Sequence, residues 1–223
     1  MGAAIELPAS VDLLEAIRTN HLIYNRLSGQ YERTGRARLR QAKRWLKPVF
    51  DELAVRESRT LLELGPADGY LTGYLTTKVP EVTAIDFAPR MCEATRRNAP
   101  RARVVEGEFL DHDFTTTFDV ILVSAFAHLF PPPGDLAVLR KVRSLLSGSG
   151  IAYVATTLHP VHDEGYLPKT ADSVRWRTRY TAQSFETLID TSGLAIESSY
   201  VTRDRLSPDK TWGNWIVVDG GAR

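Results

Sequence analysis

A short run of acidic and glycine residues is the part of this sequence best suited to bind a cofactor. Residues 61–72 are LLELGPADGYLT, so an apolar strand is followed by a turn and then by a helix. Gly65 and Gly69 permit a sharp backbone turn and close approach of a ligand, and the helix after them offers free N–H groups. Two of the three glycines of the dinucleotide fingerprint are missing, since Ala67 and Tyr70 stand in their places. The run predicts a loop for a different nucleotide cofactor.

A second acidic residue stands where such a cofactor would present its ribose. The strand predicted at 82–86 ends in Asp86, 23 positions after Glu63. A carboxylate at the tip of this strand can accept hydrogen bonds from both ribose hydroxyls. Taken alone, an acid at a strand end is more often a helix cap or a solvated charge. Its order and spacing relative to the glycine run favour the ribose role.

The pattern acid-x-Gly-x-small-x-Gly, from Glu63 to Gly69, resembles the first motif of the class I S-adenosylmethionine (SAM) methyltransferases, with Ala67 in place of the usual middle glycine. The resemblance extends over about residues 60–156. It implies SAM as cofactor and S-adenosylhomocysteine as product. The residues that it assigns to the cofactor are Tyr24, Tyr31, Glu63, Gly65, Ala67, Gly69, Asp86, Phe87, Met91, Glu108, Phe109, Leu110, Ser124 and Ala125.

Some of these assignments have competing interpretations that the sequence leaves open. The resemblance has Glu108 accept from the adenine amino group, but Asp111 or Asp113 in the same loop could do so instead. Phe87 and Phe109 could belong to the core.

Tyr24 and Tyr31 resemble the aromatic residues that precede the core in many small-molecule methyltransferases and fold over the cofactor. An aromatic face there favours the sulfonium charge. Both tyrosines could equally be ordinary packing of a helical cap.

Strands and helices alternate along the chain in the order that builds a parallel sheet. The resemblance implies an α/β fold: a Rossmann-like, seven-stranded, mostly parallel sheet with helices on both faces and a final antiparallel hairpin whose last strand inserts between its neighbours. The expected strands are 60–64, 82–86, 103–106, 118–123, 150–156, 194–201 and 212–218, and the expected helices are 70–78, 89–98, 135–147 and 181–192.

We expect one globular domain in two parts, an N-terminal helical cap at 1–56 and a SAM-binding core at 57–223 with a lid near 157–180. The segment 159–180 is the least regular part of the sequence. The cap shows two helical patterns, and the second carries an apolar, core-facing stripe made of Leu39, Trp45, Leu46, Val49, Phe50 and Leu53.

Methyl transfer demands little acid–base chemistry, because the sulfonium already carries an activated methyl group and a good leaving group. Catalysis is mainly alignment and exclusion of water, and a general base is optional. His159, just past the fifth expected strand, is the favoured base. His128 follows the fourth strand and resembles a histidine of ubiquinone- and menaquinone-type methyltransferases that is often a packing residue. We expect transfer to an oxygen or nitrogen of a small molecule.

Two other functions stay open. A nucleic-acid (RNA) methyltransferase could use the basic helix at 33–47. Against adenine or amide targets, residues 124–127 lack the Asn/Asp-Pro-Pro-aromatic segment that such enzymes share. A non-catalytic SAM-binding protein would have the same fold. Arg175, Arg177 and Arg179 alternate along an extended segment, so they could clamp an anionic substrate or form an exposed strand edge.

The composition of the chain limits the functions that it can have. The 223 residues are 43% hydrophobic with a formal net charge of +1, which suits one substantial core and gives no global attraction to nucleic acid. The single Cys92 excludes an internal disulfide or a cysteine-rich zinc site, and His159 and His162 beside two acids make only a weak metal pattern, so we expect no metal. Without a long apolar run or a secretory pattern, we expect a cytoplasmic protein with no membrane partner. A homodimer is left open.

Overall fold

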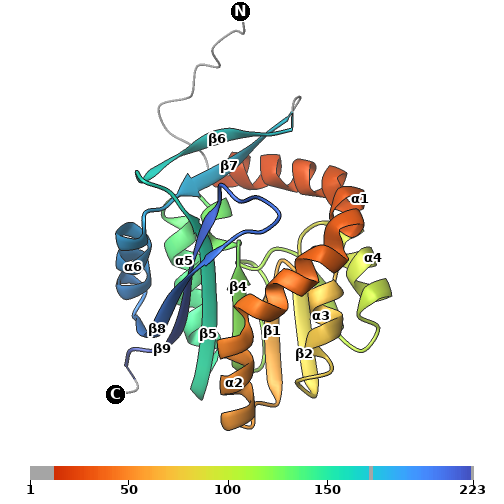
Figure 1. The fold of residues 1–223 in the computed structure, drawn as a ribbon, viewed down its shortest axis with the longest axis vertical. Coiled ribbons are helices and arrows are strands. Elements are labelled where there is room, and N and C mark those ends of the chain that lie inside the picture. Colours follow the sequence, from red (N-terminus) through yellow and green to blue (C-terminus); the bar gives the residue numbers. More distant parts are fainter. Residues whose placement is uncertain (1–12, 171–172, 222–223) are drawn as a thin grey trace, which may run out of the picture.

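The computed structural model describes residues 13–170 and 173–221 and contains a seven-stranded sheet in the order β3-β2-β1-β4-β5-β9-β8 (Figure 1). Residues 1–12 of the expected cap, 171–172 of the expected lid and 222–223 of the expected core lie outside the described residues. The strands of this sheet are β1 (Thr60–Leu64), β2 (Glu81–Asp86), β3 (Arg103–Glu106), β4 (Phe118–Ser124), β5 (Leu146–Leu158), β8 (Leu194–Arg203) and β9 (Thr211–Asp219).

The strands pair as the sequence predicted. β3, β2, β1, β4 and β5 are parallel, whereas β9 pairs antiparallel with both β5 and β8 and so lies between them. The expected Rossmann-like sheet with an inserted final strand is confirmed. β5 begins at Leu146, four residues before the expected start at 150. The carboxyl ends of the parallel strands therefore meet at one edge, where open α/β sheets place their ligands.

Helices cover both faces of the sheet because successive strand side chains point to opposite sides. Leu62 packs with α5 (Gly134–Leu145) and α6 (Ala182–Thr191), while its neighbour Leu61 packs with α2 (Lys47–Val55) and α3 (Tyr70–Leu75). The remaining helical elements of the core are α4 (Pro89–Asn98) and a single 3-10 turn, η1 (Ala127–Leu129). Each face has its own apolar cluster.

Two helices precede the sheet, as expected, but they divide the predicted stripe between them. α1 (Leu13–Trp45) is 33 residues long and passes over the carboxyl ends of the strands (Figure 1). The helix is interrupted at Leu46 because Pro48 has no N–H to donate to the carbonyl four residues before it, and its ring crowds that carbonyl. Val49 packs on the sheet, whereas Trp45 stays on α1 at the ligand edge. No helix within the described ranges is long and apolar enough to cross a membrane.

The segment expected to be irregular forms a regular hairpin, so that expectation is wrong. β6 (Asp163–Thr170) and β7 (Ser173–Arg179) pair antiparallel in a separate two-stranded sheet. The alternation of arginines with Trp176 along β7 is the period-2 pattern of a half-buried strand. Trp176 is buried and makes an edge contact with Tyr166 at 5.4 Å between ring centroids. The hairpin lies beside the N-terminal half of α1 (Figure 1).

Gly69 should be essential for the turn into α3. Its φ is +75°, and an added Cβ would lie 2.5 Å from the backbone Cα of Thr95 on α4. Gly69→Ala is therefore strained in backbone and in packing, and we expect it to lower the free energy of unfolding by about 2–4 kcal/mol. Gly148→Ala is the matched control, because nothing lies within 4 Å of its added Cβ. Urea unfolding measures the free energy of unfolding of both variants. An equal and small decrease in the two would contradict the role of Gly69 in the turn.

Candidate functional site

A cavity of about 630 Å³ lies at the carboxyl edge of the sheet. Its floor is the β1–α3 loop and the tips of β2 and β4, and its roof is α1, the β6–β7 hairpin and the β8–β9 loop. The residues that line it include Tyr24, Tyr31, Arg38, Trp45, Glu63, Gly65, Ala67, Asp68, Asp86, Phe87, Met91, Ser124, Ala125, His128, Thr157, Lys169, Arg175, Arg177, Leu206 and Trp212. Its volume is in the usual range for small-molecule and cofactor sites, about 300–1,000 Å³.

The floor loop turns through residues with positive φ. Gly65 has a φ of +65° and Ala67 a φ of +55°, so the sequence places an alanine where the backbone is left-handed. An L-residue there costs roughly 1–2 kcal/mol, which makes the substitution for glycine less mild than its single methyl suggests. Such a turn exposes backbone N–H groups to the cavity.

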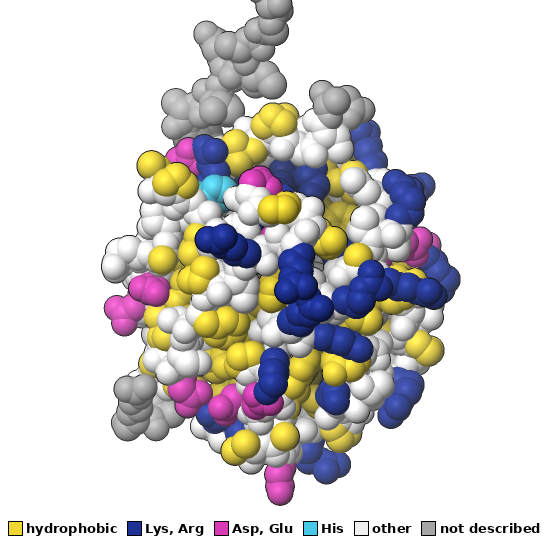
Figure 2. Space-filling view, in the orientation of Figure 1, with side chains coloured by type: hydrophobic (Ala, Val, Ile, Leu, Met, Phe, Trp, Pro, Cys, Tyr) yellow, Lys and Arg dark blue, Asp and Glu magenta, His cyan; other side chains and the backbone are white. Residues whose placement is uncertain are grey.

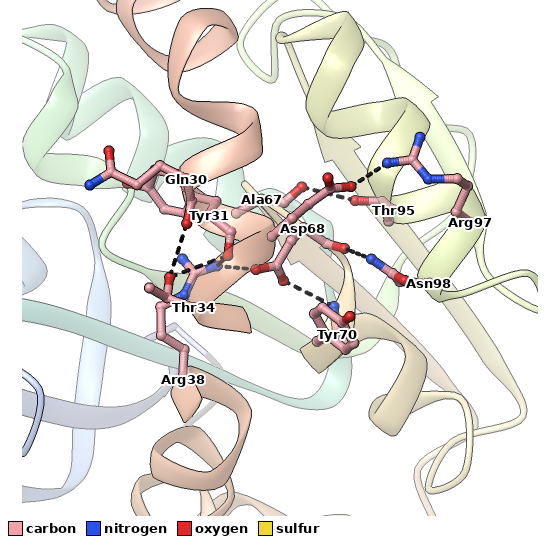
Figure 3. Close-up of polar contacts among 11 residues, drawn as sticks. Gln30, Tyr31, Thr34, Arg38, Ala67, Asp68, Tyr70, Thr95, Arg97 and Asn98 are labelled. Carbon is pink, nitrogen blue, oxygen red and sulfur yellow. Dashed lines mark hydrogen bonds and ion pairs between the residues drawn. The ribbon is translucent and has the colours of Figure 1, made fainter. Parts of the chain in front are cut away.

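α1 and α4 hold this loop from both sides (Figure 3). Arg38 on α1 forms an ion pair with Asp68, whose other oxygen accepts from the Tyr70 N–H at 3.1 Å. From α4, Asn98 donates to the Asp68 carbonyl at 2.7 Å and Thr95 donates to the Ala67 carbonyl at 3.2 Å. The loop is thus fixed before any ligand arrives, which lowers the entropic cost of binding.

Asp86 presents a buried carboxylate at the tip of β2. It is 8% exposed, and Oδ1 accepts the Ala88 N–H at 2.9 Å. Burial raises the pKa of Asp86 to about 6, although hydrogen bonds from the Ala88 and Ala67 amides oppose the shift. A buried carboxylate of this kind gains from donors that a ligand supplies, and the two hydroxyls of a ribose are such donors.

One face of α1 supplies much of the roof. Tyr24, Tyr31, Arg38 and Trp45 are spaced seven residues apart, so they lie along one side of the helix, and all four line the cavity. Burial raises the pKa of Tyr31, whose hydroxyl therefore stays protonated. The heptad spacing is the sequence signal that could have found Arg38, which sequence reasoning missed.

Ten of the fourteen residues predicted for the cofactor line this cavity: Tyr24, Tyr31, Glu63, Gly65, Ala67, Asp86, Phe87, Met91, Ser124 and Ala125. Four do not. Gly69 shapes the turn into α3, Phe109 is buried in the core against Phe126, and Leu110 packs on the same core. Glu108 faces a small adjacent pocket.

His21 on α1 fills the place beside Glu108 that the sequence prediction gave to adenine. Its ring stacks on Phe87 at 4.0 Å between centroids with planes 10° apart, and its Nε2 is hydrogen-bonded to Glu108. A flat nitrogen ring between these two residues is the arrangement expected of an adenine. Sequence reasoning missed His21, since nothing in its local sequence shows that α1 brings it to β3.

The two candidate bases lie in different surroundings. His128 is 2% exposed, lines the cavity and shares a 3.0 Å hydrogen bond between Nδ1 and Thr156 Oγ1. Burial and the nearby arginines hold its pKa well below 6.5. His159 lies at the root of the hairpin outside the cavity lining, with Nε2 3.1 Å from Thr157 Oγ1, and burial and Arg177 lower its pKa. The geometry brings only His128 to the cavity.

The described residues contain no cluster of three or more His, Cys, Asp or Glu side chains that could hold a metal ion. Of the two acids beside His162, Asp163 is instead paired with Arg179 across the hairpin.

Comparisons with known proteins agree with this geometry. Residues 61–150 match a family model described as a methyltransferase domain. The chain superposes on Burkholderia thailandensis 1,6-didemethyltoxoflavin-N1-methyltransferase with a TM-score of 0.75 and 18% identity, over 96% of this chain and 93% of that one. The chain also superposes on a SAM-dependent methyltransferase from Clostridium acetobutylicum with a TM-score of 0.68 and 13% identity. That superposition covers 89% of this chain and 100% of the other. Residues 61–150 thus match a methyltransferase domain, and the chain has the fold of the class I methyltransferases.

Similarity to curated relatives is more local. The chain is 40% identical over 71 residues to the probable ribosomal RNA small subunit methyltransferase A of Methanopyrus kandleri, covering 30% of this chain and 26% of that protein. It is 30% identical over 114 residues to an uncharacterized methyltransferase of Alkaliphilus oremlandii, covering 51% of this chain and 52% of that protein. The chain spans about a quarter and about half of the length of these two relatives.

The residues that line the cavity fit SAM. Asp86 offers a buried acceptor for a ribose, the left-handed turn at Gly65 and Ala67 offers backbone donors, and Tyr24 and Tyr31 offer aromatic faces for a sulfonium. Glu63 is 5% exposed at the cavity and accepts from Thr72 Oγ1 at 2.7 Å.

Glu63 should make stability pH-dependent. Burial raises its pKa from 4.5 to about 7, so the folded state keeps a proton that the unfolded chain has lost, and the free energy of unfolding falls as the pH rises from about 5 to 8. Each unit of pKa corresponds to about 1.4 kcal/mol, so Glu63→Gln should remove a fall on the order of 3 kcal/mol. Urea unfolding at pH 5 and pH 8 measures this. Parallel pH dependence in parent and variant would show that Glu63 titrates normally.

Proposed function

We propose that this protein transfers the methyl group of SAM to an oxygen or nitrogen of a small-molecule acceptor. The observation that supports this proposal most directly is the shape of the site. The cofactor floor and the space for the acceptor form one cavity of about 630 Å³, which is covered by α1, the hairpin and the β8–β9 loop. A roofed cavity suits a small acceptor and excludes water from the sulfonium.

The roles follow from position. When bound, SAM would supply an activated methyl group on sulfur. Asp86 would hold the ribose, the loop at Gly65–Asp68 would hold the amino-acid end, and Tyr24 and Tyr31 would lie over the positive sulfonium. Ser124 and Ala125 at the β4 tip would lie beneath the reacting centre. The protein's contribution is alignment of the acceptor with the methyl group.

His128 is the base candidate that this proposal favours where the acceptor loses a proton. Its depressed pKa keeps the imidazole neutral near pH 7, so it can accept a proton. His159 stays the second candidate, because it connects to the cavity through Thr157, which lines it.

RNA is the second candidate acceptor, and one surface favours it. Lys and Arg side chains gather over the face that α1 crosses (Figure 2). The exposed basic residues of α1 and the start of α2 include Arg33, Arg36, Arg40, Lys43, Arg44 and Lys47. Two relatives are named as ribosomal RNA methyltransferases, but each match covers 30% of this chain. The roofed cavity favours the small molecule.

A place in cytoplasmic small-molecule biosynthesis belongs to the same proposal. It rests on the lone, buried Cys92, whose thiol suits a reducing compartment.

The cofactor part is tested with Asp86→Ala. Loss of charge-assisted ribose hydrogen bonds should weaken S-adenosylhomocysteine binding about tenfold or more in titration calorimetry. Glu81→Ala is the control, since Glu81 is an exposed acid at the other end of the same strand and lies outside the cavity lining. For the acceptor, methyl-labelled SAM is supplied with a macromolecule-free cell extract or with total RNA. We expect label in the small-molecule fraction; label in RNA alone, or none in either, would contradict the proposal.

The base assignment is tested with His128→Gln and His159→Gln. If His128 accepts the proton, its replacement should lower turnover by roughly a hundredfold while S-adenosylhomocysteine binding is kept. Because the pKa of His128 is depressed, the rate of the parent should stay level from pH 8 to 6.5 and fall only below that range. Loss of turnover in the His159 variant alone would move the base to the hairpin root, and normal rates in both would leave alignment as the mechanism.

A further inference from the structure

The hairpin brings three cationic side chains into the cavity. Lys169 from β6 and Arg175 and Arg177 from β7 all line it. Arg177 is only 8% exposed, and the Nε atoms of both arginines are buried without a hydrogen-bond partner. The two Nε–H donors therefore have no acceptor within the part of the protein that the structure describes.

The contacts that these cations do make are with neutral groups. Arg175 Nη1 donates to the Tyr24 hydroxyl at 2.6 Å, and Arg177 Nη2 donates to Thr157 Oγ1. The Lys169 Nζ lies 5.8 Å and 5.7 Å from the ring centroids of Tyr24 and Tyr31. Across residues 13–170 and 173–221, no carboxylate forms an ion pair with any of the three.

The acids of the cavity have other partners. Asp68 is paired with Arg38, Glu63 is bonded to Thr72, and Asp86 is bonded to the Ala88 N–H. Asp204, on the β8–β9 loop, accepts from the Gln41 side chain and the Leu206 N–H. The three cations therefore repel one another without a counter-charge. Burial, followed by repulsion from Arg175, lowers the pKa of Lys169 to about 8 and that of Arg177 to about 10.

Arg177 is buried and Lys169 and Arg175 are half-buried, and such charges are costly without a counter-ion. An anion that reached all three would recover much of that cost. We propose that Lys169, Arg175 and Arg177 bind an anionic group, carboxylate or phosphate, of the methyl acceptor. The forks of two arginines suit the planar or tetrahedral oxygens of such groups. The apolar walls at Leu206 and Trp212 would contact the rest of the molecule, so the acceptor is a small, partly apolar anion.

This inference rests on the proposed function, because it identifies the acceptor of the same transfer. Arg179 gives it a matched control. It lies on the same strand, two residues after Arg177, but it is outside the cavity lining and pairs with Asp163 on β6. Arg179 is thus an arginine of the same hairpin with a carboxylate partner, whereas Arg175 and Arg177 have none among the described residues.

The test uses full-length protein saturated with S-adenosylhomocysteine, so that the cofactor's own carboxylate already has its place. Calorimetry at pH 7 measures the binding of phenyl phosphate, of benzoate, and of benzyl alcohol as the neutral probe. We expect at least one of the two anions to bind, and to bind at least tenfold more tightly than the alcohol. The relative affinities of phenyl phosphate and benzoate then distinguish phosphate from carboxylate. Arg175→Gln and Arg177→Gln should each weaken the anion at least tenfold, Arg177→Lys less, and Arg179→Gln not at all.

Three results would overturn the inference. Anions that fail to bind the loaded protein, or that bind equally well to all variants, would remove the site. A loss of S-adenosylhomocysteine affinity in the Arg175 and Arg177 variants, with no separate anion binding, would assign the cations to the cofactor. Binding of a short oligoribonucleotide, blocked by Arg177→Gln and not matched by either small anion, would assign them to RNA. Failure of the proposed function looks different: the loaded protein would bind the anions, yet no small molecule would be methylated.

Discussion

The buried side chain of Asn20 joins the three segments on which the cavity depends. It is 2% exposed; its Nδ2 donates to the Leu129 carbonyl at 2.9 Å and to the Trp176 carbonyl at 3.4 Å, and its Oδ1 accepts the Trp176 N–H at 2.9 Å. One amide thus ties α1 to η1 and to β7, segments 109 and 156 residues away. A buried amide holds position strongly because each unpaired group would carry a desolvation cost of about 1–3 kcal/mol. These hydrogen bonds therefore fix the position of α1 relative to η1 and β7.

Two walls of the cavity carry opposite charges. Asp86 and Glu63 lie at the carboxyl ends of parallel strands, whereas Arg175 and Arg177 alternate along β7 of the hairpin. The other charged residues of the lining include Arg38, which pairs with Asp68, and Asp204 and Lys210 of the β8–β9 loop. Tyr24 and Tyr31 on α1 lie between the two walls. The acidic wall and the tyrosines suit a ribose and a sulfonium, and the cationic wall suits an anion. A cavity organised in this way orients two different ligands toward each other before any chemistry takes place.

Much of the sheet and its floor could be predicted from the sequence, because the signals are local. The apolar strand ending at Leu64, the turn at Gly65 and the acid at Asp86 each follow from residues within a few positions. The structure places Glu63, Gly65, Ala67 and Asp86 at the cavity, although their roles with SAM stay predictions. The alternation of elements predicted the parallel sheet, and the family resemblance predicted the insertion of the final strand between its neighbours.

The roof could not be predicted in the same way, because it depends on which long-range contacts form. Nothing local shows that His21 reaches Glu108 across 87 residues, or that Arg38 reaches Asp68. The hairpin was missed since a strand with arginines on alternate positions looks like a solvated edge until a cavity is known to lie beneath it. His128 was ranked below His159 on position along the chain, whereas the fold brings His128 to the cavity.

The most direct measurement is a crystal structure of the full-length protein with S-adenosylhomocysteine. Both ribose hydroxyls should lie within hydrogen-bond distance of Asp86, the sulfur should face the β4 tip at Ser124–Ala125, and the side of the cavity formed by Arg175 and Arg177 should remain open for an acceptor. A ligand whose carboxylate sits on Arg177, or whose ribose lies away from Asp86, would contradict this arrangement of cofactor floor and acceptor roof.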